Sequence, residues 1–142
     1  MKRQRVLAAC VLGTMVACAP VAQESAGSSE AGLIPSLNVR VDGDSVHMTL
    51  HLTSALEAPV DLEFSSAQRS DFQVRRPGGE IVWTWSADKL FAQALGTERL
   101  SPGETLTWSA TWHGASPGRY EATGRVVSTS HPQTVTVPFE VQ

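Results

Sequence analysis

The sequence has few cysteines, and neither lies where a disulfide-bonded domain would need it. Only two occur in 142 residues, Cys10 and Cys18, both near the N-terminus. The rest of the chain therefore has neither a disulfide framework nor a thiolate metal site. Its stability must come from an apolar core, which a domain of about 100 residues can supply without cross-links.

The sequence also lacks an apolar run long enough to span a membrane. Its longest such segment, residues 6–17, is shorter than the roughly 20 residues that a spanning helix needs. Lys2, Arg3 and Arg5 precede this segment, and a basic start before a short apolar run is typical of an export signal. We therefore predict that residues 1–17 are a signal peptide.

The signal segment ends in Met15-Val16-Ala17-Cys18, which is similar to the lipobox of bacterial lipoproteins. In that family the signal peptide is cleaved before the cysteine, and the thiol is then acylated. The resemblance implies lipid attachment at Cys18 and an exported protein, lipid-anchored to the bacterial cell envelope on a periplasmic or outer surface. An earlier match ending at Cys10 would leave too short an apolar segment. The alternative is an ordinary secretory signal with Cys18 unmodified.

Positive charge is scarce in the expected mature chain. Cleavage before Cys18 would leave eight basic residues against 14 acidic ones, a net charge of −6. Nucleic-acid binding requires clustered positive charge, so we expect no nucleic-acid partner. Residues 18–36 are rich in Ser, Ala, Gly and Glu and are predicted to form a lipidated flexible tether. One globular domain, residues 37–142, is expected to follow as a monomer.

Apolar and polar residues alternate through most of this domain, as in Val46, Met48, Leu50 and Leu52. The expected strands cover residues 37–41, 46–53, 60–64, 72–74, 81–85, 105–112, 120–129 and 134–141. Gly and Pro turns separate them, so the sequence predicts an all-β fold. Specifically, we expect an immunoglobulin-like antiparallel β-sandwich of about seven or eight strands without a disulfide. Residues 87–95 are the only helix candidate.

Three motifs that suggest chemistry are better explained as structure. Residues 114–118 match the G-x-S-x-G hydrolase motif, but Pro117 has no N–H to donate to an oxyanion, so a turn is predicted. His47 and His51 would lie roughly 13 Å apart on a strand, too far to share a metal. Asp42 and Asp44 flank Gly43 in what reads as a hairpin turn. We therefore expect neither a catalytic site nor a cofactor.

The aromatic residues leave two alternatives open. Trp108 and Trp112 share an apolar face and are expected in the core. Trp83 and Trp85 either pack in the core or form an aromatic platform for a sugar or peptide. Tyr120, after a Pro-Gly turn, is either a tyrosine-corner analogue or an ordinary core residue.

The central sequence, residues 65–95, resembles the signature of the intracellular proteinase inhibitor (BsuPI) family. The resemblance is carried by Gln68-Arg69-x-Asp71-Phe72, by residues 79–86, by Lys89-x-Phe91-x-Gln93, by residues 100–104 and by Pro117-Gly118-x-Tyr120. It implies an all-β binding domain that inhibits a serine protease. Because an export signal removes the chain from the cytoplasm, the implied target is an envelope protease.

Two loops beside the central hairpin, residues 65–70 and 86–96, are the predicted contacts for such a protein partner. The candidate contact residues are Gln68, Arg69, Lys89, Phe91 and Gln93. Either Arg69 or Phe91 would fill a specificity pocket, and the sequence favours neither. Asp71, Ser86 and Lys89 are expected to hydrogen-bond the loops into shape. The alternative function is a non-inhibitory module that binds protein or glycan in the envelope.

Overall fold

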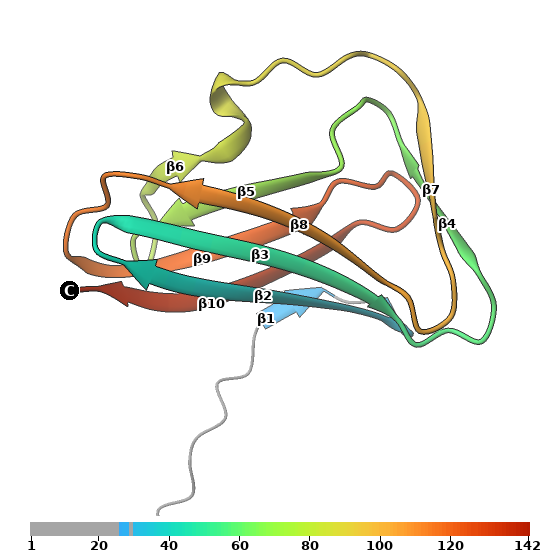
Figure 1. Cartoon of the computed structure of the whole chain (residues 1–142), viewed down its shortest axis with the longest axis horizontal. Coiled ribbons are helices and arrows are strands. Elements are labelled where there is room, and N and C mark those ends of the chain that lie inside the picture. The colour runs from blue at the N-terminus through green and yellow to red at the C-terminus, as the bar shows by residue number, and fades with distance from the viewer. Residues whose placement is uncertain (1–25, 29) are drawn as a thin grey trace, which may run out of the picture.

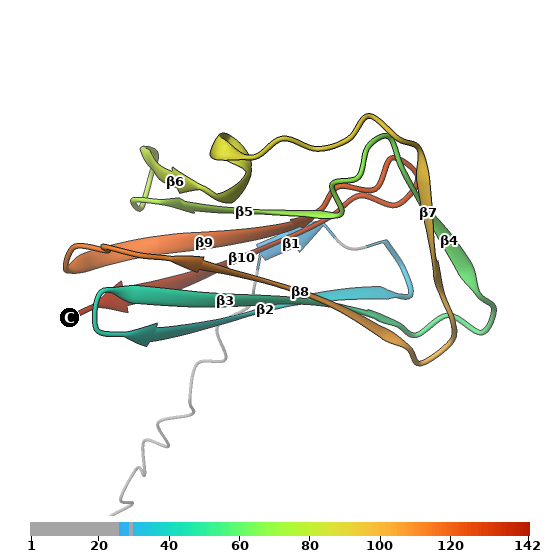
Figure 2. The same ribbon diagram turned by 45° about the horizontal axis from the view of Figure 1, so that its top comes forward.

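The computed structural model describes residues 26–28 and 30–142, which form two layers of antiparallel strands (Figures 1 and 2). The strands are β1 (Ala26–Ser28), β2 (Leu33–Asp42), β3 (Ser45–Ser54), β4 (Val60–Phe64), β5 (Ser70–Arg75), β6 (Ile81–Thr84), β7 (Gly96–Leu100), β8 (Thr105–Trp112), β9 (Gly118–Val126) and β10 (Gln133–Val141). One sheet has the order β1-β10-β9-β5-β6 and the other β2-β3-β8, while β4 and β7 pair at one end of the molecule. The predicted β-sandwich is confirmed.

Strand β3 shows how the sequence pattern builds the core. Its alternate residues Val46, Met48, Leu50 and Leu52 have no solvent exposure. The residues between them lie on the outer face of the sheet, because successive side chains of a strand point in opposite directions. Each buried side chain of this kind contributes about 1.5–3 kcal/mol, so this one strand supplies much of the sandwich's stability.

The two sheets approach closely at Gly124 on β9. A Cβ atom at this position would lie 3.1 Å from Leu50 Cδ1 and 3.3 Å from Leu37 Cδ1. A larger residue would make these leucine side chains shift by a few tenths of an ångström, so glycine favours the close contact between the layers.

The turn between β2 and β3 confirms the hairpin prediction. Asp42 pairs with Ser45, and Gly43 adopts a left-handed φ of 61° that favours glycine. Asp42 and Asp44 are exposed at this turn.

The helix prediction for residues 87–95 is wrong. A single 3₁₀ turn, η1 (Trp85–Asp88), ends at Lys89, whose φ of −112° and ψ of 147° are extended. No residue of η1 is buried, and a short helix without a buried face gains too little to persist. No helix among the described residues is long and apolar enough to cross a membrane.

The structure adds two strands to the predicted set and lengthens a third. Strand β7 pairs with β4, and β1 pairs with β10 inside the range predicted as a tether. Strand β2 begins at Leu33, whose side chain is buried in the core. The folded domain therefore starts before residue 37, the predicted boundary. The predicted signal peptide, residues 1–17, and Cys18 lie outside the described residues.

Tyr120 combines the two roles that the sequence left open. Its ring is 2% exposed and makes an edge contact with Trp112, so it is a core residue. Its hydroxyl also donates a 2.7 Å hydrogen bond to the Ser116 carbonyl, in the loop before β9. This bond back to an upstream backbone carbonyl is the tyrosine-corner arrangement.

Replacing Tyr120 with Phe keeps the ring and removes this hydrogen bond. We expect the free energy of unfolding to fall by about 0.5–1.5 kcal/mol, measured by urea denaturation followed by tryptophan fluorescence. Ser116→Ala is the matched control and should be neutral, because only the backbone carbonyl of Ser116 accepts the bond. Equal stability of Tyr120→Phe and the unmodified chain would contradict the corner's role.

Candidate functional site

The two predicted contact loops lie against each other in the structure. The N–H of Ala67 donates to the carbonyl of Ala92 at 2.9 Å, which joins residues 65–70 to residues 86–96. The second loop runs from η1 along the β5–β6 side of the molecule to β7 (Figures 1 and 2). We call these two segments together the contact surface.

Asp71 fixes the start of the longer loop to β5. Its Oδ1 accepts hydrogen bonds from the N–H groups of Phe72, at 2.9 Å, and Ser86, at 3.2 Å. Its Oδ2 accepts a bond from Ser86 Oγ at 2.8 Å. One carboxylate therefore holds η1 against the sheet, as the sequence predicts for Asp71 and Ser86.

Trp85 is the second anchor of this loop. Its ring meets the buried Phe72 edge-on at 6.3 Å and Phe91 at 5.9 Å between ring centres. Lys89 Nζ lies 4.9 Å from the centre of the same ring, a cation–π distance. Trp85 is half-buried, and its contacts with three of the chain's own side chains make it a packing anchor rather than an open platform for a ligand.

The other tryptophans belong to the core and its margin. Trp112 is 9% exposed, as predicted, and Trp108 and Trp83 are half-buried against the core cluster. Trp83 lies opposite the buried Val74 on β5, so it shares the inner face of the sheet. Trp83 therefore extends the core.

Arg69 is occupied by partners within the chain. Its Nε forms a 3.0 Å ion pair with Glu98, and its Nη1 donates to the Ser66 carbonyl at 2.8 Å. The guanidinium also lies 4.5 Å from the centre of the Phe64 ring. These contacts hold the shorter loop against β4 and β7. Arg69 would have to break all of them to enter a pocket of a partner protein.

The remaining candidate residues differ in how free they are. Gln68 donates from Nε2 to the Ser70 carbonyl at 3.1 Å, which stabilises its own loop. Lys89 and Phe91 both pack on Trp85, and Lys89 Nζ lies 3.7 Å from Asp88. Gln93 is exposed. The structure thus gathers all five candidates around one surface and engages most of them in holding it together.

The sequence reasoning missed the side chain that this surface presents most fully. Leu90, between Lys89 and Phe91, is completely exposed, with a relative exposure of 101%. Leu95 is 89% exposed near the end of the same loop. No local signal indicated this position, because residues 87–95 resemble a short helix in sequence and the end of η1 at Lys89 is seen only in the structure.

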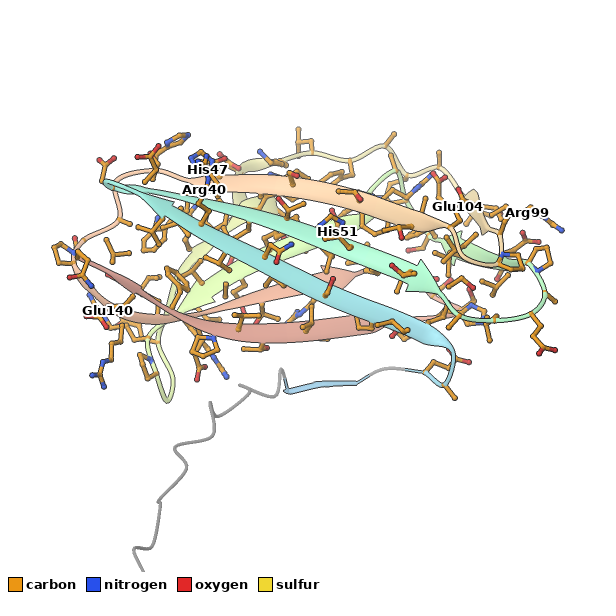
Figure 3. All side chains as sticks on the ribbon, turned by 60° about the horizontal axis from the view of Figure 1, so that its bottom comes forward. Arg40, His47, His51, Arg99, Glu104 and Glu140 are labelled. Carbon is orange, nitrogen blue, oxygen red and sulfur yellow. The ribbon has the colours of Figure 1, made fainter. Side chains whose placement is uncertain are left out.

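The motifs interpreted as structure take the predicted positions. His47 and His51 lie along the outer face of β3 (Figure 3), where each Nδ1 is about 3 Å from a threonine hydroxyl of β8. The G-x-S-x-G sequence, residues 114–118, forms the loop from β8 into β9. Among residues 26–28 and 30–142, no three His, Cys, Asp or Glu side chains gather into a possible metal site.

Solved structures with a similar fold include parts of larger proteins. β-Glucosidase 3B from Thermotoga neapolitana is 19% identical with a TM-score of 0.41, over 82% of this chain and 16% of that chain. The sporulation control protein Spo0M from Bacillus subtilis is 10% identical with a TM-score of 0.48, over 78% and 48% respectively. This chain therefore spans less than half the length of either protein. No curated protein matches the chain.

The anchoring role of Asp71 can be tested by Asp71→Asn, which removes the charge and one acceptor oxygen. We expect a loss of about 1–3 kcal/mol in unfolding free energy and faster amide exchange at Ser86 and Lys89. Asp61→Asn is the matched control, because Asp61 makes only an exposed ion pair with Arg99 at 3.3 Å. Equal effects of the two substitutions would contradict an anchoring role for Asp71.

The family comparison covers both the fold and the contact surface. The BsuPI family, described as intracellular proteinase inhibitor, matches residues 33–131. This range is more than two thirds of the chain, begins with β2, and contains both contact loops with their anchors Asp71 and Trp85. The chain therefore belongs to the BsuPI family of intracellular proteinase inhibitors.

Proposed function

We propose that this protein is a lipid-anchored inhibitor of a serine protease in the bacterial cell envelope, and that the contact surface binds the enzyme. Family membership supports a proteinase-inhibitor-like function. The observation that carries the proposal is the loop of residues 86–96, which is largely exposed yet held at Asp71 and Trp85.

Holding the loop matters because binding a flexible segment costs conformational entropy. A loop already fixed in its bound shape loses less freedom on association, so more of the contact energy appears as affinity. Small inhibitors often achieve this with disulfides, which the two N-terminal cysteines of this chain do not offer to the loop. Here the Asp71 hydrogen bonds, the Trp85 packing and the Ala67–Ala92 bond take that role.

The proposed location rests on the N-terminal sequence. A basic start, a short apolar run and the Met15–Cys18 match support export and lipidation. Two or more acyl chains hold a protein firmly on a membrane, whereas a single chain binds only marginally. An anchored domain meets proteases of the envelope, so the proposed target differs in location from that of an inhibitor working in the cytoplasm.

Inhibition can be tested with the full chain, purified from membranes in detergent, against a panel of serine proteases. We expect concentration-dependent inhibition of at least one enzyme, measured with a chromogenic peptide, while the chain stays intact on a gel. We expect the loop to resist cleavage, because its contacts with Asp71 and Trp85 limit the movement of its backbone. A chain that is degraded, or that leaves every enzyme unaffected, would instead support a non-inhibitory binding module.

Lipid attachment can be tested by labelling cells with a radioactive fatty acid. We expect the chain with Cys18 in place to incorporate the label and to sediment with membranes, and the Cys18→Ser variant to lose both properties. Cys10→Ser is the matched control and should keep label and location, because Cys10 lies within the predicted signal peptide. Label that persists in Cys18→Ser would contradict the proposed anchor.

A further inference from the structure

Leu90 stands out among the exposed apolar residues because of its surroundings. Single apolar side chains on a surface are common and need no functional explanation. The large apolar residues exposed among the described side chains are Ile34, Ile81, Leu90 and Leu95. Ile34 and Ile81 are only about half exposed, at 53% and 54%, and both lie in strands. Leu90 is fully exposed, whereas the side chains before and after it, Lys89 and Phe91, both contact Trp85.

The backbone is extended at Lys89, and the side chains on both sides of Leu90 contact Trp85. Lys89 has extended φ and ψ angles, and successive side chains of an extended chain point in opposite directions. Lys89 and Phe91 both contact the Trp85 ring, at 4.9 and 5.9 Å. Leu90 therefore projects away from the domain, from a position held on both sides.

Hydrogen bonds also hold the main chain on both sides of Leu90. The Lys89 N–H donates to the Ser86 carbonyl at 3.1 Å, and the Ala92 carbonyl accepts from Ala67 at 2.9 Å. Leu95 lies beyond these bonds, immediately before β7. The main chain around Leu90 is therefore held by hydrogen bonds on both sides, whereas Leu95 lies outside the segment between these bonds.

We propose that Leu90 occupies the primary specificity pocket of the target, and that the target is a serine protease that prefers leucine or another large apolar residue. This inference rests on the inhibitor function proposed above. Extended segments bind clefts by adding a strand to an exposed edge, with alternate side chains entering pockets. Leu90 is the outward side chain of such a segment, and its size and apolarity fit an apolar pocket.

The other two candidates for the pocket are already engaged. Arg69 would have to leave Glu98, the Ser66 carbonyl and the Phe64 ring, and Phe91 would have to leave Trp85. Leu90 gives up no contact within the chain to enter a pocket. Occupation by Leu90 therefore requires the least rearrangement of the contact surface.

Exchanging the side chain should change the class of protease that is inhibited. The full chain in detergent is assayed against chymotrypsin and subtilisin, which accept large apolar residues, and against trypsin, which requires a basic one. We expect the unmodified chain to inhibit at least one apolar-preferring enzyme. Leu90→Arg should weaken that inhibition by about 100-fold, the loss typical of a central contact residue, and should create inhibition of trypsin.

Ile34→Arg is the matched control, since it places the same charge on another exposed apolar residue, in β2 and outside the contact surface. It should leave both inhibition constants unchanged. The urea midpoint of Leu90→Arg should match that of the unmodified chain, because Leu90 lies in solvent.

The outcomes separate this inference from the proposed function. Inhibition that is unchanged in Leu90→Arg, or lost equally in Ile34→Arg, overturns the role of Leu90 and leaves the inhibitor function in place. Inhibition of trypsin alone by the unmodified chain also overturns it, because the pocket would then take a basic residue. An unmodified chain that inhibits none of the three enzymes contradicts both proposals.

Discussion

The contact of Leu50 with Gly124 sets the spacing of the two sheets, and the rest of the structure depends on it. Leu50 lies at the centre of the buried face of β3, and Gly124 lies on β9, the middle strand of the larger sheet. Strand β9 pairs with β5, which carries the anchor Asp71 and also Phe72, the residue on which the anchor Trp85 packs. With no cystine between the layers, apolar packing alone keeps these strands in place.

The contact surface is connected to this core through two consecutive residues of β5. Phe72 points inward and is 1% exposed, while its ring edge supports Trp85. Asp71 points the other way and binds Ser86. Phe72 and Asp71 lie on opposite faces of the strand and hold the consecutive residues Trp85 and Ser86. The start of the loop is therefore fixed to the sheet by non-covalent contacts.

The alternation of residues explains which parts of the fold could be predicted. Strand β3 was predictable because every second residue is apolar and buried. Strand β7 was not, because Leu100 is its only fully buried residue and lies directly before a turn. Alanine and leucine in residues 87–95 favour a helix locally, but packing of Lys89 and Phe91 on Trp85 holds the chain extended.

The candidate site was predictable to a similar extent. Asp71 and Ser86 hold the loop by hydrogen bonds, as predicted, whereas the Lys89 side chain, for which the same role was predicted, packs on Trp85. The outward position of Leu90 follows from where η1 ends and from the placement of Trp85 on Phe72. Both depend on contacts between strands, and no local pattern in the sequence reports such contacts.

The pairing of β1 with β10 has a consequence for the geometry of an anchored protein. If Cys18 carries lipid, only seven residues lie between it and Ala26, and an extended chain over these eight residue-to-residue steps reaches at most about 28 Å. A tether ending at residue 36 would have let the domain move over more than twice that distance. Strands β1 and β6 form opposite edges of the same sheet, so such an anchor would keep the β1 edge close to the bilayer and leave the loop after β6 at the far edge.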